Sequence, residues 1–351
     1  MQHALDLAWR GWGRVHPNPL VGAVVLDDGV LVGEGWHGEY GAAHAEPIAL
    51  GAAGPRARGA TLVVTLEPCA HQGKQPPCVQ AILRAGIRRV VAALPDPNPI
   101  ASGGATLLRE AGVPVEIGLD RHAAEAQNAA FLHPFRNAER PFVALKLATS
   151  LDGRIADAEG RSRWISGSDA RGYVHWLRAG FDAIAVGGRT ARADDPSLTV
   201  RGSVTPRVAP ARVVFDAGAD LPGSLGLVRS ASEVPTFVVA SPQAPTSRLT
   251  ALERAGVRVV AAPDLNEGLG ALRAAGIGSL LVEGGGRLAG ALLGNGLCDR
   301  FYWIQSPLWL GERGVPAVAG LPSEPIARAE RWRTIERRAL GEDTLLVLDR
   351  R

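Results

Sequence analysis

The sequence predicts an α/β fold divided into two domains, on three observations. The first is length, because 351 residues exceed the roughly 150 residues of a typical domain. The second is periodicity, since short apolar runs alternate with segments whose apolar residues recur at helical spacing. The third is a polar break at residues 137–141, which ends in proline and precedes a new apolar run. A composition of 46% hydrophobic and 21% charged residues suits a chain that buries a core.

The first domain, placed at residues 1–138, is expected to hold a mixed sheet with helices packed on its faces. Strands are expected at residues 22–26, 30–33, 61–66 and 89–93, and helices at 1–12, 47–53, 79–85, 106–111 and 121–131. The Asp28-Gly29 pair between the first two strands is a hairpin signal. These elements predict a compact α/β unit ahead of the polar break.

The second domain, placed at residues 141–351, repeats the alternation and is expected to form another α/β unit. Strands are expected at residues 142–149, 183–186, 212–215, 236–239, 258–261, 279–282, 301–305 and 344–348, and helices at 170–178, 247–255, 268–275 and 287–293. Loops rich in proline and glycine separate them, and no tandem repeat is present.

The charge of the chain argues against a nucleic-acid partner. Its 38 basic and 35 acidic residues leave a net charge of +3, a weak field for a chain of this length. No apolar run reaches the roughly 18 residues of a membrane span. The N-terminus has the pattern of an amphipathic helix rather than a secretion signal, and three cysteines favour a reducing compartment. We therefore expect a cytoplasmic protein with neither a nucleic acid nor a membrane as partner.

The strongest chemical signal is a group of one histidine and two cysteines. His44 opens a His-x-Glu motif, and Cys69 and Cys78 each follow a proline. One imidazole and two thiolates suit Zn²⁺, and a catalytic zinc site keeps its fourth position for water. Glu46 is placed to exchange a proton with that water and with a leaving amine, as in the zinc deaminases of amino-substituted rings. A structural zinc site would need a fourth ligand, for which His71 is the alternative.

The spacing of the cysteines carries a specific resemblance. Eight residues separate Cys69 from Cys78, and the run at residues 66–78 occurs together with His-Pro-Asn-Pro-Leu-Val-Gly at 16–22 and Asp-Pro-Asn-Pro at 96–99. With these motifs the chain resembles the bifunctional riboflavin-biosynthesis deaminase/reductase family. The resemblance implies a cytidine-deaminase-like α/β/α domain followed by a dihydrofolate-reductase-like α/β domain that uses NADPH.

Within the first domain, the resemblance implies that Asn18 lines the pyrimidine pocket. His71 and Lys74 lie in the loop between the cysteines, where they either meet the substrate phosphate or remain solvated. Pro47 stands where the family usually has an apolar residue, and proline disfavours helical geometry at the residue before it. We therefore expect the helix after His44 to begin at Pro47. Two further departures are Gln75, in place of a common threonine, and Ala105, in place of a glycine.

Within the second domain, the only other lysine of the chain, Lys146, stands inside an apolar strand six residues before Asp152. Taken alone, these two residues are better explained by a lysine that extends from a strand end and by an ordinary hairpin turn than by a site. The resemblance implies that they hold the sugar or its phosphate. It also implies NADPH contacts from Ala148, Trp164, Thr190, Asp194, Gly285, Gly286, Arg287, Leu288, Ala289, Gly290 and Ala291. The implied substrate contacts are Ser162, Arg178, Leu198, Arg201 and Glu283.

Arg178 and Arg201 are further expected to clamp the ribose phosphate, because guanidinium pairs bidentately with phosphate oxygens. The remaining cysteine, Cys298, lies in the second domain and is expected to be a core or surface thiol. The choice between NADPH and NADH rests on the resemblance, since no single arginine marks a 2′-phosphate site.

The function predicted from these motifs is zinc-dependent deamination of 2,5-diamino-6-(5-phosphoribosylamino)pyrimidin-4(3H)-one, then NADPH-dependent reduction of its ribosyl side chain. The partner is a small phosphorylated pyrimidine, and the family favours a homo-oligomer. Three alternatives remain at this point: a nucleic-acid base deaminase, a binding protein with a structural zinc, and an enzyme in which one half has lost its activity.

Overall fold

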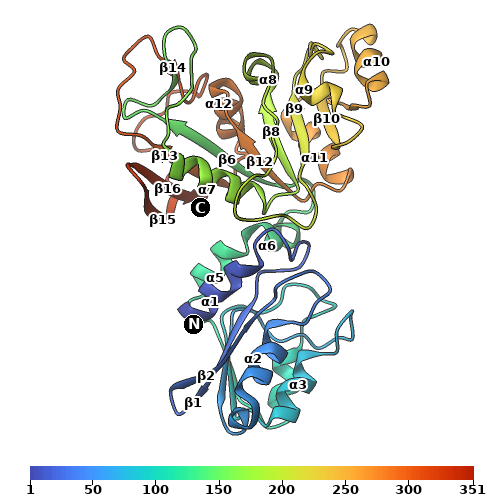
Figure 1. The fold of residues 1–351 in the computed structure, drawn as a ribbon, viewed down its shortest axis with the longest axis vertical. Coiled ribbons are helices and arrows are strands. Elements are labelled where there is room, and N and C mark those ends of the chain that lie inside the picture. Colours follow the sequence, from blue (N-terminus) through green and yellow to red (C-terminus); the bar gives the residue numbers. More distant parts are fainter. The chain divides into compact units, whose positions relative to one another are not determined.

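The computed structural model describes residues 1–351, which form two compact units, Met1–Arg136 and Asn137–Arg351 (Figure 1). No helix of either unit has the length and apolar character needed to cross a membrane. Both units are α/β, so the predicted fold class is confirmed.

The first unit is built on a five-stranded sheet in the order β2-β1-β3-β4-β5. The strands are β1 (Gly22–Asp27), β2 (Val30–Trp36), β3 (Thr61–Val64), β4 (Arg89–Ala92) and β5 (Val115–Ile117). β1 runs antiparallel to β2 and β3, whereas β3, β4 and β5 are parallel. Parallel neighbours need crossover connections, and α3 (Cys78–Ala85) and α4 (Gly104–Glu110) supply them.

Helices cover both faces of this sheet. α2 (Ala45–Ala53), α3 and α4 bury Ala49, Ile82 and Leu108 against one face. α1 (Gln2–Ala8) buries Ala4 and Leu7 against the other face. α5 (Arg121–Gln127) and α6 (Ala129–Arg136) complete the unit, with 3₁₀ turns at Trp9–Gly11 and Gly54–Ala57. The arrangement is the three-layer α/β/α architecture predicted for residues 1–138.

Two helix predictions in this unit were wrong in detail. The helix expected at residues 121–131 is divided into α5 and α6 at Asn128. The Asn128 amide bonds both backbone groups of Leu20, accepting from its N–H at 2.8 Å and donating to its carbonyl at 3.0 Å. The helix expected to begin at Pro47 begins at Ala45. A proline in the first turn costs no hydrogen bond there, because the first four N–H groups of a helix have no intrahelical acceptor.

The second unit contains a nine-stranded sheet in the order β11-β10-β9-β8-β12-β6-β13-β16-β15. Its strands are β6 (Phe142–Thr149), β8 (Ala183–Gly187), β9 (Ala211–Phe215), β10 (Thr236–Ala240), β11 (Arg258–Ala261), β12 (Ser279–Glu283), β13 (Arg300–Gln305), β15 (Arg333–Leu340) and β16 (Asp343–Asp349). The strands from β11 to β13 in this order are parallel, and β16 and β15 add an antiparallel edge. β7 (Arg154–Ala156) and β14 (Val315–Pro316) form a separate pair.

Two apolar cores lie against this larger sheet. One is shared with α11 (Leu265–Ala274) and α12 (Gly286–Gly294), through Leu269 and Leu292. The other is shared with α9 (Gly226–Arg229) and α10 (Thr246–Arg254), through Leu227 and Leu252. The remaining helices are α7 (Ser168–Arg178) and α8 (Gly188–Asp194).

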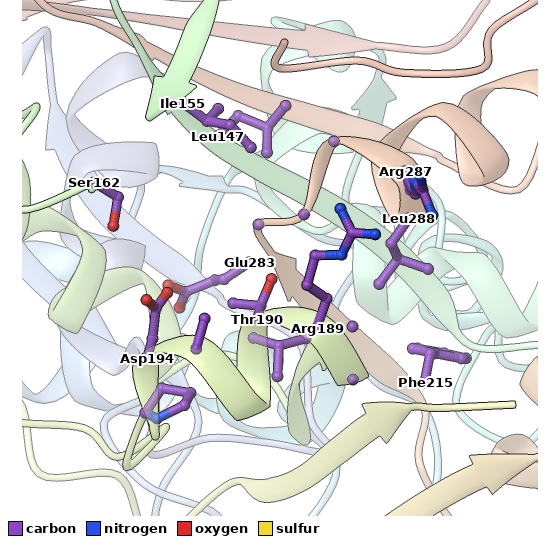
Figure 2. Close-up of a pocket in the computed structure, with 18 of the residues that line it drawn as sticks. Leu147, Ile155, Ser162, Arg189, Thr190, Asp194, Phe215, Glu283, Arg287 and Leu288 are labelled. Atoms are coloured by element: carbon purple, nitrogen blue, oxygen red, sulfur yellow. The ribbon is translucent and has the colours of Figure 1, made fainter. Parts of the chain in front are cut away.

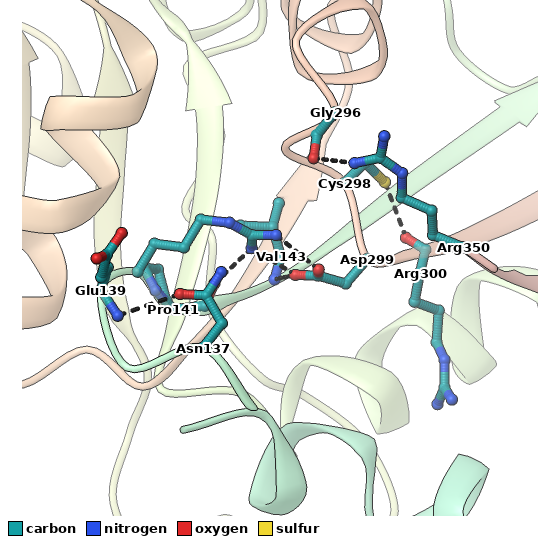
Figure 3. Close-up of polar contacts among 10 residues, drawn as sticks. Asn137, Glu139, Pro141, Val143, Gly296, Cys298, Asp299, Arg300 and Arg350 are labelled. Carbon is teal, nitrogen blue, oxygen red and sulfur yellow. Dashed lines mark hydrogen bonds and ion pairs between the residues drawn. The ribbon is translucent and has the colours of Figure 1, made fainter. Parts of the chain in front are cut away.

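The start of the second unit is tied to the strand β13 region by a charged pair. The Arg140 guanidinium donates two hydrogen bonds to the Asp299 carboxylate, at 2.6 and 2.7 Å, and the Val143 N–H donates to the same carboxylate at 2.8 Å (Figure 3). The neighbouring Cys298 is buried, and its Sγ donates to the Arg300 carbonyl. Cys298 is therefore a core thiol, as expected.

Candidate active sites

The predicted zinc ligands meet in the first unit. His44 immediately precedes α2, Cys69 lies in the loop after β3, and Cys78 is the first residue of α3. Their ligand atoms lie within 4.8 Å of one another. His44 Nδ1 is 3.3 Å from Cys78 Sγ and 3.5 Å from Cys69 Sγ. Tetrahedral zinc with ordinary Zn–N and Zn–S bonds separates such atoms by about 3.5 Å, so these residues fit the ion.

The group contains three candidate ligands and no fourth, which matches the donor number of catalytic zinc sites rather than structural ones. His71, the alternative fourth ligand, lines the adjacent pocket without joining the group. Its buried Nδ1 has no hydrogen-bond partner. The geometry therefore leaves one coordination position for a water or a substrate.

Glu46 lies beside these ligands, in the first turn of α2. Its side chain is only 3% exposed. Burial, and secondarily the neighbouring Cys69 thiolate, raises the pKa of Glu46 to about 7. Because α2 begins at Ala45, Glu46 follows His44 on the same helical turn and faces the same pocket.

A pocket of about 250 Å³ opens next to the metal ligands. Asn18 lines it and donates from Nδ2 to His37 Nε2 at 3.1 Å. His37 Nδ1 in turn donates to the Ala43 carbonyl at 3.1 Å, which fixes the neutral tautomer that accepts from Asn18. Burial lowers the pKa of His37, in agreement with a neutral ring. Sequence reasoning missed His37, because a lone histidine in a loop carries no distinguishing pattern.

The loop between the cysteines closes one side of this pocket. Lys74 Nζ lies 4.1 Å from the centre of the Tyr40 ring, a cation–π contact. Gln75 Nε2 donates to the Gly41 carbonyl at 2.9 Å. Both contacts tie the loop to the segment that precedes His44. Lys74 and His71 are thereby held at the pocket rather than free in solvent.

The Glu-Pro-Cys and Asp-Pro-Asn-Pro motifs support this site structurally. The Glu67 carboxylate accepts from the Asp96 N–H at 3.0 Å and from the Ala105 N–H at 2.8 Å. Asn98 Oδ1 accepts from the Ile100 N–H, which closes the turn. Glu67 thus joins the Cys69 loop to the turn after β4. Ala105 takes part through its backbone N–H, which does not require a particular side chain.

The second unit holds a cavity of about 1820 Å³ (Figure 2). Pockets for one small ligand measure roughly 300–1,000 Å³, so this cavity has room for a dinucleotide together with a substrate. The predicted residues that line it are Lys146, Ala148, Ser162, Trp164, Arg178, Thr190, Asp194, Leu198, Arg201, Glu283, Gly285, Gly286, Arg287, Leu288 and Ala291.

Three predicted residues do not line this cavity. Asp152 instead accepts hydrogen bonds from Ser150 Oγ at 2.6 Å and from the N–H groups of Leu310 and Gly311. Its carboxylate holds a loop together, and the expected contact with the sugar or its phosphate stays a prediction. Ala289 and Gly290 are among the buried residues of α12, and a Cβ on Gly290 would lie 2.0 Å from the Ala319 carbonyl.

Lys146, Arg178 and Glu283 form a charged cluster in the cavity wall. Lys146 and Glu283 are register partners on β6 and β12, with Nζ and Oε2 4.0 Å apart. Arg178 pairs with the same carboxylate through Nε and Nη2, at 2.5 and 3.0 Å, and donates from Nη1 to the Thr199 carbonyl. Burial lowers the pKa of Lys146 against the opposing effect of Glu283. Burial of Glu283 tends to raise the pKa of its carboxyl group, but the charges of Arg178 and Lys146 outweigh this effect and lower that pKa.

This pairing bears on the predicted phosphate clamp. Arg178 donates its hydrogen bonds to the Glu283 carboxylate and to the Thr199 carbonyl. In this structure it therefore orients Glu283. The Arg201 side chain has no ion pair in the structure, and its N–H donates to His175 Nδ1 at 3.2 Å. Of the two arginines, only Arg201 offers a free guanidinium to a phosphate.

A glycine turn connects β12 to α12 at the cavity. Gly284 and Gly285 have φ angles of +83° and +85°, which glycine adopts without strain. A Cβ on Gly286 would lie 2.2 Å from the Pro316 carbonyl. Trp164, 69% exposed, lies at another side of the cavity with the Arg171 guanidinium 4.6 Å from its ring centre.

Comparisons with known proteins assign a family to each unit. Residues 1–94 match the family described as "Cytidine and deoxycytidylate deaminase zinc-binding region". Residues 141–346 match the "RibD C-terminal domain". Over its full length, the chain is 40% identical to the riboflavin biosynthesis protein RibD of Aquifex aeolicus, with 97% of that protein covered. It is 39% identical to the Escherichia coli protein of the same name, over 99% of this chain and 98% of that one.

Two solved structures agree with these matches. Acinetobacter baumannii RibD is 36% identical, with a TM-score of 0.82 over 100% of this chain and 97% of that chain. The Thermotoga maritima diaminohydroxyphosphoribosylaminopyrimidine deaminase/5-amino-6-(5-phosphoribosylamino)uracil reductase is 33% identical, with a TM-score of 0.83 and the same coverage. Together with the zinc-ligand geometry, these matches confirm the resemblance: the chain belongs to the RibD family, the bifunctional deaminase/reductases of riboflavin biosynthesis.

Proposed function

We propose that this protein deaminates 2,5-diamino-6-(5-phosphoribosylamino)pyrimidin-4(3H)-one in its first unit and reduces the ribosyl side chain with NADPH in its second. The observation that carries the proposal is the convergence of His44, Cys69 and Cys78, with the buried Glu46 beside them. The 1820 Å³ cavity of the second unit supports a reaction between two bound molecules.

In the deaminase site, His44, Cys69 and Cys78 hold zinc, which when bound supplies a water acidic enough to act as a nucleophile near neutral pH. The Glu46 carboxylate, buried beside these ligands, would take up a proton from the nucleophile and deliver it to the departing amine. Asn18, oriented by His37, holds the pyrimidine ring through its free amide groups. Lys74 and His71, at the rim, are placed to meet the phosphate.

In the reductase site, bound NADPH would supply the hydride for reduction of the opened ribose at its anomeric carbon. Lys146 and Glu283 bind the sugar hydroxyls from the cavity wall, and Arg178 holds the Glu283 carboxylate in position. Arg201 and Ser162 contact the substrate phosphate. Thr190, Asp194, Trp164 and the turn that opens α12 contact the cofactor.

We further propose that the deaminase domain spans residues 1–138 and the reductase domain 141–351. The division of the chain between Arg136 and Asn137 and the match beginning at residue 141 support these bounds. The substrate is a small phosphorylated pyrimidine, with no role for a nucleic acid or a membrane. We also propose a cytoplasmic location and homo-oligomeric assembly, as the resemblance to this family implies.

The proposal is tested by supplying the diaminopyrimidinone phosphate with and without NADPH. Ammonia release and NADPH oxidation are then followed separately. We expect ammonia in both conditions, and NADPH oxidation only once deamination has begun. Absence of NADPH oxidation under every condition would contradict the reductase assignment, and absence of ammonia with zinc present would contradict the deaminase assignment.

A further inference from the structure

The second unit contains a single histidine, His175, which belongs to none of the motifs found in the sequence. It lies near the end of α7, one helical turn before Arg178, and lines the large cavity. Its Nδ1 accepts a hydrogen bond from the Arg201 backbone N–H at 3.2 Å. His175 therefore contacts the main chain of the arginine whose guanidinium is free to bind the substrate phosphate.

Two side chains on successive turns of α7 hold the segment that carries Arg201. Arg178 Nη1 donates to the Thr199 carbonyl at 2.8 Å, and His175 accepts from the Arg201 N–H. These two hydrogen bonds use the backbone groups on either side of Val200. In a sheet, a neighbouring strand would pair such groups, whereas here two side chains of one helix pair them.

The backbone of Arg201 has no other regular support. Residues 195–210, between α8 and β9, form neither helix nor strand, and no backbone–backbone hydrogen bond holds residues 199–201. The segment passes close to His175, because a Cβ on Gly202 would lie 4.0 Å from the His175 Cβ. The position of Arg201 in the cavity wall thus depends on the contacts that α7 makes with its main chain.

The contact requires an imidazole without a proton on Nδ1, because a protonated ring nitrogen donates and cannot accept. Burial, and after it the positive charges of Arg178 and Arg201, lowers the pKa of His175. Glu283 on β12 and the Thr199 carbonyl act in the opposite direction without reversing the shift. The ring is therefore neutral near neutral pH, in agreement with its role as an acceptor.

We propose that His175 is a positioning residue of the reductase site, which sets where the Arg201 guanidinium meets the substrate phosphate. The inference rests on the proposed reductase function. His175 acts through the main chain of Arg201, so it needs no contact of its own with the reacting atoms. Its loss should weaken the binding of the phosphorylated substrate without slowing the transfer of hydride.

The test compares the full chain with His175→Ala and His175→Asn, with 5-amino-6-(5-phosphoribosylamino)uracil and NADPH supplied. Asparagine keeps an acceptor, because its Oδ1 is as many bonds from Cβ as the Nδ1 of histidine. We expect His175→Ala to raise KM for the uracil compound by about fivefold, the loss of one hydrogen bond, with kcat and KM for NADPH unchanged. His175→Asn should keep KM within about twofold of the original value.

An unchanged KM in His175→Ala would overturn the inference. So would a loss of kcat or of NADPH affinity in that variant, because either would indicate a general structural role. A KM in His175→Asn as high as in His175→Ala would also overturn it, since the acceptor would then not matter.

Two further comparisons show whether the effect passes through Arg201. In an Arg201→Ala background, His175→Ala should raise KM no further, because substitutions that remove the same interaction are not additive. The uracil compound without its phosphate, measured as a competitive inhibitor, should bind His175→Ala and the unchanged protein equally well. Additive effects in the double variant, or weaker binding of the phosphate-free compound to His175→Ala, would contradict the inference.

A matched control lies on the same helix. Ser168 is exposed at the start of α7 and does not line the cavity, so Ser168→Ala should leave every constant unchanged. Equal effects of Ser168→Ala and His175→Ala would contradict a specific contact. Absence of NADPH oxidation by the unchanged protein would overturn the proposed function and the inference with it, whereas differences among the variants bear on the inference alone.

Discussion

The start of α2 determines how His44 and Glu46 are placed at the deaminase centre. His44 has extended backbone angles just before the helix, and Glu46 lies in its first turn. The two side chains therefore face one pocket although only Ala45 separates them. Pro47 does not prevent this arrangement, because its missing N–H falls where the helix has no acceptor to satisfy.

Replacing Glu46 by glutamine keeps the size of the side chain but removes the group that exchanges protons. We expect Glu46→Gln to lower the rate of ammonia release by about 10²–10⁴-fold, the usual contribution of general acid–base catalysis. Zinc content, measured by atomic absorption, should stay at the level of the unchanged protein, since Glu46 is not a ligand. Glu110→Gln, at the exposed end of α4, is the control and should keep full activity. Full ammonia release from Glu46→Gln would remove Glu46 from the mechanism.

Lys146 presents its charge to the reductase cavity from a buried strand. Lys146→Met keeps the chain length without the charge, and Lys146→Arg keeps the charge but brings a larger group next to Arg178. We expect both variants to lose NADPH oxidation by at least tenfold, while ammonia release stays unchanged. If Lys146→Arg oxidised NADPH at the original rate, the particular role given to this lysine would be wrong.

At the scale of elements, α12 is positioned by two glycines that face loop backbone. A Cβ on Gly290 would lie 2.0 Å from the Ala319 carbonyl. We expect Gly290→Ala to lower the free energy of unfolding of the second unit by about 1–3 kcal/mol, as overpacking does. Gly172, inside α7 with nothing near its Cβ position, is the control. Gly172→Ala should stabilise by about 0.5–1 kcal/mol. Denaturant unfolding measures both, and equal effects of the two substitutions would refute the packing argument.

The strands that line the cores were predictable because their apolar runs are nearly continuous. β6 and β11 have the predicted bounds, and the other buried strands differ by a residue or two. β15 was missed because it is an edge strand with exposed, charged side chains and no apolar alternation. β7, β14 and β5 are too short to show periodicity. α8 was missed because its sequence, rich in Gly and Arg, has no apolar face.

The same distinction holds for the sites. The zinc ligands were predictable because His44, Cys69 and Cys78 are metal-binding residue types that stand in characteristic motifs at a characteristic spacing. His37 was not, since it acts only through contacts with Asn18 and Ala43. The turn contacts of Asp152 could not be told from a ligand contact in advance, because a turn aspartate and a ligand-binding aspartate look alike in sequence. The pairing of Arg178 with Glu283 joins residues far apart in the chain, which no local pattern reveals.

At the scale of the whole molecule, each unit has its own core and its own pocket. Removing zinc with a chelator is therefore expected to abolish ammonia release and to leave reduction intact when the deaminated compound, 5-amino-6-(5-phosphoribosylamino)uracil, is supplied. Restored ammonia release on adding zinc is the control. Loss of NADPH oxidation on chelation would indicate that the reductase depends on the metal, contrary to the assignment.

The central claim is that one chain carries two separate catalytic centres that act in sequence. It is tested most directly by mixing Glu46→Gln protein with Lys146→Met protein and supplying the diaminopyrimidinone phosphate with NADPH. Each variant alone should fail to oxidise NADPH, the first for lack of deaminated substrate and the second for lack of a working reductase. The mixture should release ammonia and oxidise NADPH, because each variant retains the centre that the other lacks. A mixture as inactive in NADPH oxidation as its components would contradict the claim.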